Sequence, residues 1–92
     1  MGFIENLKIY VDVIVIFRKD GVMLPSEIVW DSGVSFPIKR IREIKYGCTF
    51  WESKCNRYTV EIDSERKYLY FEPNTEPEVN SFGRWFVENK NL

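Results

Sequence analysis

The stretch K-I-Y-V-D-V-I-V-I-F-R (residues 8–18) carries an apolar side chain at every odd position. A period of two is typical of a β-strand that buries one face. The even positions mix Asp12 and Arg18 with Tyr10, Ile14 and Ile16, so the second face is expected to be partly covered as well. Such a strand is typical of a small barrel or a curled sheet.

The same period of two returns along the chain, and turn residues separate the segments. Residues 19–21 (K-D-G) and 31–33 (D-S-G) supply tight turns, because Asp and Gly accept positive φ at low cost. We therefore expect further strands at about residues 22–30, 34–46, 57–63, 67–72 and 84–88. Residues 47–56 are expected to form an irregular loop.

The alternation is interrupted in two segments of the chain. Pro25 cannot donate a ladder hydrogen bond, so the second strand is expected to lie at an edge or to be bulged there. Ile38, Ile41 and Ile44 are spaced by three, which indicates a bulged strand, with a helix over 38–46 as the alternative. Residues 1–92 are thus predicted to form a single all-β domain. It is a meander of about six strands, either an SH3-like barrel or a strongly curled antiparallel sheet.

The composition bounds the function. The 92 residues carry 13 basic and 14 acidic side chains, so the global charge favours neither nucleic acid nor an acidic membrane surface as a partner. The chain has no histidine, and the six residues between Cys48 and Cys55 match no zinc or redox spacing. We expect no catalysis, no cofactor and no metal site.

The location is predicted from the start of the chain and from its apolar runs. M-G-F-I-E-N-L-K-I-Y-V-D-V (residues 1–13) lacks the pattern of a signal peptide. The longest apolar run, Val13–Phe17, is far shorter than the roughly 20 residues that span a bilayer. These features predict a cytoplasmic protein without a membrane partner.

Five short motifs follow one another along the chain in a recognisable order. They are V-I-V-I-F-R-K-D-G (13–21), I-V-W-D-S-G (28–33), R-Y-T-V-E-I (57–62), Y-L-Y-F-E (68–72) and R-W-F-V-E (84–88). In this order they resemble a family of small uncharacterised proteins from Gram-positive bacteria, which is a domain of unknown function. The resemblance implies a β-barrel-like fold and no activity. Residues 47–56 depart from the family pattern, which is rich in Gly and Ala there.

Aromatic residues are the first candidates for a binding site. Phe50 and Trp51 stand together in the expected loop, where tryptophan is typical of a binding hot spot, although Trp51 could instead plug the end of the barrel. A second group is predicted to form a face that suits single-stranded nucleic acid, because rings stack on bases and cations meet phosphates. The alternative for these rings is packing in the core. The second group is Tyr58, Tyr68 and Tyr70 with Arg57 and Lys67.

The expected function depends on these surfaces. We expect a non-catalytic binding module that engages an unknown protein, or a second copy of itself, through an exposed strand edge or through residues 47–56. Nucleic-acid binding by the Tyr/Arg face of residues 57–70 is the alternative. Cys48 and Cys55 would pair only if their Cα atoms lie within about 7 Å, and otherwise they are unrelated free thiols.

Overall fold

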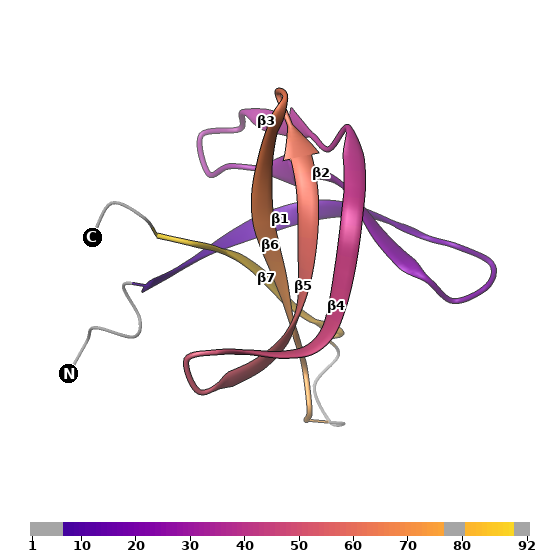
Figure 1. Ribbon diagram of the computed structural model, residues 1–92, viewed down its shortest axis with the longest axis vertical. Coiled ribbons are helices and arrows are strands. Elements are labelled where there is room, and N and C mark those ends of the chain that lie inside the picture. The colour runs from indigo at the N-terminus through magenta and orange to yellow at the C-terminus, as the bar shows by residue number, and fades with distance from the viewer. Residues whose placement is uncertain (1–6, 77–80, 90–92) are drawn as a thin grey trace.

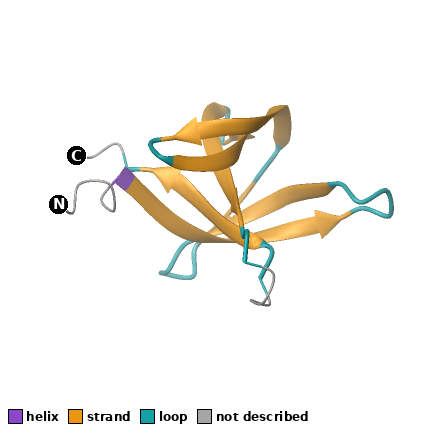
Figure 2. Cartoon of the chain, turned by 90° about the horizontal axis from the view of Figure 1, so that it is seen from below, coloured by secondary structure: helices purple, strands orange, loops and turns teal. Residues whose placement is uncertain are grey.

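The computed structural model describes residues 7–76 and 81–89, which contain seven β-strands (Figure 1). All pairs are antiparallel, and the sheet order is β3-β2-β1-β7-β6-β5-β4. Figure 2 shows that the sheet bends over itself into a half-barrel, so the all-β prediction is confirmed in its curled-sheet form. The strands are β1 (Lys8–Phe17), β2 (Met23–Val29), β3 (Ser35–Pro37), β4 (Arg40–Phe50), β5 (Ser53–Ile62), β6 (Glu65–Pro73) and β7 (Gly83–Glu88).

The strand order is that of a meander with one crossing. Each strand lies beside its neighbour in the chain, except that β3 and β4 lie at opposite ends of the sheet and β7 lies beside β1 in the middle. Ile38 and Lys39 make the crossing. The Ile38 N–H donates to the carbonyl oxygen of Ser26 in β2, and the Lys39 N–H donates to that of Glu61 in β5, both at 2.9 Å. The two ends of the sheet therefore meet here, and the expected third strand is divided into two.

The strand interpretation of the segment 38–46 is confirmed for residues 40–46, and the bulge beside Pro25 is confirmed as well. The ladder between β4 and β5 shifts register at residues 41–43 and again at 45–48. The ladder between β1 and β2 shifts so that Val15 pairs with Pro25 while its neighbour Ile14 pairs with Glu27. Bulges of this kind bend a strand and increase its twist, which helps the sheet to curl.

The main core fills the concave face of the sheet. Its members alternate along each strand, and the register fixes which ones face inward, because directly paired residues share a face. Tyr58 pairs with Leu69 and therefore belongs to this core. Each fully buried aliphatic or aromatic side chain contributes roughly 1.5–3 kcal/mol here. The buried residues are Val11, Ile28, Tyr58, Val60, Ile62, Leu69, Phe71 and Trp85.

A second, smaller cluster lies on the outer, convex face, and we call it the outer cluster. It consists of Cys55, Tyr70 and Phe86 with Cys48 and Phe50 packed against them. The rings of Tyr70 and Phe86 are stacked, with centroids 4.9 Å apart and planes 6° from parallel. Phe50 lies 4.9 Å from the Tyr70 ring and 5.1 Å from the Phe86 ring.

The tip of the β4–β5 hairpin folds across the outer face to cover this cluster. Ser53, at the start of β5, accepts a hydrogen bond from the side chain of Lys8 in β1. Two strands, β7 and β6, lie between β1 and β5 in the sheet. The tip must therefore reach over both of them.

The prediction of an irregular loop over residues 47–56 is wrong. β4 and β5 continue through this segment, and a two-residue turn of Trp51 and Glu52 joins them, with Trp51 at φ 54° in the left-handed region. The alternation is hard to see because Cys48, Phe50 and Cys55 belong to the outer cluster, whereas Ile41 and Ile44 of β4 pack against the concave core.

Candidate binding surfaces

The outer edge of β4, meaning the edge that does not pair with β5, is the first candidate surface. β4 is 11 residues long and lies at the end of the sheet, where β5 is its only ladder partner within residues 7–76 and 81–89. Beside this edge a groove of about 690 Å³ separates β4 from β2. Its apolar lining includes Ile16 and Tyr46, which are 55% and 66% exposed. An unpaired strand edge with an apolar groove is suited to pairing with another extended chain.

The charges along this edge are mainly positive. Lys39, Arg40 and Arg42 line the groove together with a single acidic side chain, Glu43. Arg42 is held by Glu61, with Nε and Nη2 donating to one carboxylate oxygen at 3.0 and 2.8 Å. This hydrogen bond lowers the pKa of Glu61. Lys39 and Arg40 are exposed, so the groove favours an acidic partner.

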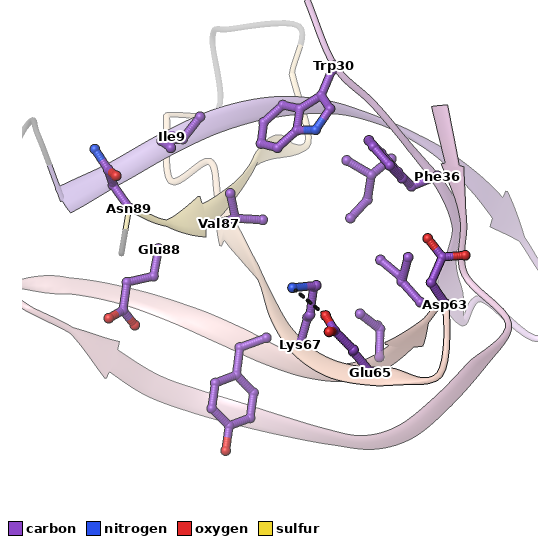
Figure 3. Close-up of a pocket in the computed structure, with 13 residues that line it drawn as sticks. Ile9, Trp30, Phe36, Asp63, Glu65, Lys67, Val87, Glu88 and Asn89 are labelled. Carbon is purple, nitrogen blue, oxygen red and sulfur yellow. Dashed lines mark ion pairs between the residues drawn. The ribbon is translucent and has the colours of Figure 1, made fainter. Parts of the chain in front are cut away.

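A pocket of about 430 Å³ at one end of the concave face is the second candidate (Figure 3). Its walls are apolar, and the rings of Trp30 and Phe36 meet edge to face with centroids 6.5 Å apart. At the rim the Nζ of Lys67 lies 3.2 Å from a carboxylate oxygen of Glu65. The volume lies within the roughly 300–1,000 Å³ that small ligands occupy, but the exposed rim charges give little orientation to a ligand.

This pocket was not predicted from the sequence, although one signal of it is present there. Glu65 and Lys67 alternate along β6 in phase with the core residues Leu69 and Phe71, so all four side chains face the concave side. Charged side chains in inward positions indicate that the core ends there, because an ion is rarely buried without a close partner. The concave face is therefore open to solvent beyond Leu69.

The predicted tyrosine face is not a single surface. Tyr68 and Tyr70 lie on the outer face, but Tyr58 pairs with Leu69 and lies on the concave face. Tyr58 is 3% exposed and Tyr70 is 7% exposed, and burial raises the pKa of both phenols. The expectation that the three rings form one face is wrong, because register rather than strand adjacency decides which rings share a face.

The cations of that predicted face are also divided. The guanidinium of Arg57 lies over the exposed ring of Tyr68, 4.5 Å from its centroid, on the outer face. Lys67 pairs with Val60 and lies on the concave side at the pocket rim. The structure thus brings Arg57 and Tyr68 together and separates Lys67 from them.

Phe50 and Trp51 are adjacent in sequence but differ in environment. Phe50 packs into the outer cluster, whereas Trp51 is 58% exposed at the hairpin turn. Trp51 therefore does not plug an end of the barrel. An exposed tryptophan on a tight turn can be an anchor for a partner.

An ionic network on the outer face fixes β1, β6 and β7 to one another. Glu72 lies 2.9 Å from the Nζ of Lys8 and 2.9 Å from Nη2 of Arg84. Burial alone would raise the pKa of Glu72, but the hydrogen bonds from Lys8 and Arg84 outweigh it and lower that pKa. Arg84 also lies over the ring of Tyr10, 4.1 Å from its centroid. This network is best explained as structural.

Comparison of the chain with protein-family models, with curated proteins and with solved structures gave no match. The resemblance to the Gram-positive family stays a prediction. Within the described part of the chain, no cluster of three or more His, Cys, Asp or Glu side chains has the arrangement of a metal site. The same residues contain no helix with the length and apolar character needed to cross a membrane.

Proposed function

We propose that this chain is a non-catalytic binding module that takes up an extended segment of a partner protein at the outer edge of β4. The observation that carries the proposal is the position of β4, a long strand at the end of the sheet that faces an apolar groove. Strand addition supplies affinity through main-chain hydrogen bonds, and the groove supplies specificity through side chains. We place this activity in the cytoplasm, where free thiols such as those of Cys48 and Cys55 are the resting state.

The groove also indicates the chemistry of the partner. Its lining combines apolar side chains with the basic side chains of Lys39 and Arg40. An extended segment presents alternate side chains to opposite faces, so a sequence that alternates apolar and acidic residues fits best. The two bulges in β4 limit the regular ladder to a few residues. We therefore expect weak binding, with a Kd that is micromolar or higher.

The test uses three short synthetic peptides in which Val alternates with Glu. One is unmodified, and each of the others is N-methylated at one of the two alternating sets of residues. A β-strand uses only one of its edges to pair with an edge strand, so only one methylated peptide should lose binding in calorimetric titration. Equal loss with both peptides, or with neither, would overturn the strand-addition model.

A pair of charge reversals provides the matched control. Lys39 lines the groove, whereas Lys54 is an exposed lysine in β5 at the hairpin tip. Lys39→Glu should weaken binding of the acidic peptide, and Lys54→Glu should leave it nearly unchanged. If a single-stranded oligonucleotide bound instead, with affinity that falls steeply as salt rises, the nucleic-acid alternative would replace this proposal. Self-association through β4 would appear as a concentration-dependent increase in mass that the peptide suppresses.

A further inference from the structure

The two cysteines face each other across the β4–β5 hairpin. Cys48 in β4 and Cys55 in β5 are direct register partners. Partners in an antiparallel ladder have Cα atoms about 4.5–5.5 Å apart, which falls within the 4.4–6.8 Å range of disulfides. Direct partners also project to the same side, and both thiols belong to the outer cluster. The geometric condition for pairing is therefore met.

We propose that Cys48 and Cys55 form a thiol modification site, which reacts with a small-molecule disulfide such as oxidised glutathione to close a reversible cross-strand disulfide. The inference rests on the register of the hairpin and does not depend on strand addition at β4. In the reduced state both cysteines are free, as the structure shows them.

The surroundings of the two thiols assign the order of reaction. Cys55 is 1% exposed, and burial together with the neighbouring Cys48 raises its pKa. Cys48 is half-buried, and its thiol donates a weak hydrogen bond to the carbonyl oxygen of Lys45 at 3.5 Å. Since the thiolate is the nucleophile and access limits its rate, Cys48 reacts first.

Two exchange steps complete the reaction. The Cys48 thiolate attacks one sulfur of oxidised glutathione, a mixed disulfide forms, and one glutathione thiolate leaves. The Cys55 thiol then gives its proton to solvent and attacks the Cys48 sulfur, and the second glutathione thiolate leaves and is protonated. The protein has lost two electrons and two protons, and oxidised glutathione has been reduced to two molecules of glutathione.

The site lies where a covalent bond would hold the hairpin tip. Cys48 follows the register shift at residues 45–48, and the turn that carries Trp51 lies three residues further along. The disulfide would join the strands between the bulge and the turn, and it would fix Phe50 over Tyr70 and Phe86. Oxidation should therefore slow opening of the tip and raise the Tm of the protein.

The experiment places the full chain in glutathione buffers that run from reduced to oxidised, quenches it with acid, and counts free thiols by maleimide labelling and intact mass. The expected product is a monomer that has lost two hydrogen atoms and has no maleimide and no glutathione attached. In the Cys55→Ser variant, Cys48 should retain one glutathione. In the Cys48→Ser variant, Cys55 should label at least about tenfold more slowly in the folded protein than in urea.

A urea arm separates native geometry from mere nearness in sequence. The ratio of internal disulfide to mixed disulfide should be at least about tenfold higher for the folded chain than for the unfolded chain, because the register holds the two sulfurs at high effective concentration. The proposal is overturned if the folded wild type stops at the mixed disulfide, or if it forms covalent dimers. It is also overturned if it stays reduced in buffers that fully modify Cys48 in the Cys55→Ser variant.

Discussion

Replacing Phe86 by alanine tests whether the outer cluster is a true second core. Phe86 is fully buried and stacks on Tyr70 at 4.9 Å. Phe→Ala changes in cores reduce stability by about 3–5 kcal/mol. The outer cluster has only three buried members and is covered by a hairpin tip, which we expect to close partly over the space that the ring leaves. We therefore expect a loss near the lower limit, about 3 kcal/mol.

The loss is measured by urea unfolding, followed by circular dichroism. With a slope of about 1–1.5 kcal/mol per molar urea, a loss of about 3 kcal/mol lowers the midpoint by roughly 2–3 M. A domain with about 5–15 kcal/mol of total stability would still fold, so the slope should not change. An altered slope would indicate a change in the unfolded or native ensemble instead.

A double-mutant cycle with Phe50→Ala then tests the docking of the hairpin tip. The two rings lie 5.1 Å apart, and we expect a coupling free energy of about 1 kcal/mol. Trp51→Ala, one residue further along, is the matched control. Its side chain is exposed, so its effect should stay within about 0.5 kcal/mol, with no coupling to Phe86. A Phe86→Ala loss below about 1 kcal/mol, or additivity with Phe50→Ala, would refute the reasoning.

Three further substitutions test other features. Glu72→Gln should lower the free energy of unfolding by about 2 kcal/mol at neutral pH, because Lys8, with a side chain 8% exposed, loses its carboxylate partner. Since the folded pKa of Glu72 is lowered, its contribution is present above the unfolded pKa and is lost as the pH falls through the folded pKa. Acid titration of stability should therefore be shallower in the Gln variant, and an unchanged profile would contradict the network. Gly83→Ala should lower stability in thermal unfolding by about 2 kcal/mol or more, because at φ 150° the added Cβ would overlap the backbone carbonyl oxygen of Glu72. Gly33→Ala is the control. It has open space around the added Cβ at φ 87° and should lower stability by about 1 kcal/mol. Ser64→Gly should raise stability by about 0.5–1 kcal/mol, since Ser64 stands at φ 66° in a two-residue turn that favours glycine; a lower Tm would count against that turn assignment.

The fold class could be predicted because it depends on local patterns. The alternation over residues 8–18 appears in the structure as β1. The turns at 19–21 and 31–33 appear as the connections from β1 to β2 and from β2 to β3. Pro25 indicated its bulge, and the threefold spacing of Ile38, Ile41 and Ile44 indicated a bent strand. Each of these signals is set by steric and hydrogen-bonding limits within a few residues.

The candidate site was less predictable because it depends on pairing between distant residues. The faces of Tyr58 and Tyr70 are decided by the register of β5 against β6, and a shift by one residue would exchange them. The burial of Phe50 depends on the fold of the hairpin tip across the sheet. The facing of Cys48 and Cys55 required a two-residue turn at Trp51, in a segment without a clear turn signal.

The place of β7 has a consequence for how the protein is made. This strand comes last among the seven along the chain, yet it lies in the middle of the sheet, between β1 and β6. On the ribosome, β1–β3 and β4–β6 can form two separate meanders that only the crossing at Ile38 and Lys39 connects, and no strand joins their ladders into one sheet until residues 83–88 have emerged. During translation the exposed edges of β1 and β6 would be open to mispairing, so a chaperone that binds extended nascent segments should matter more for this protein than its small size suggests.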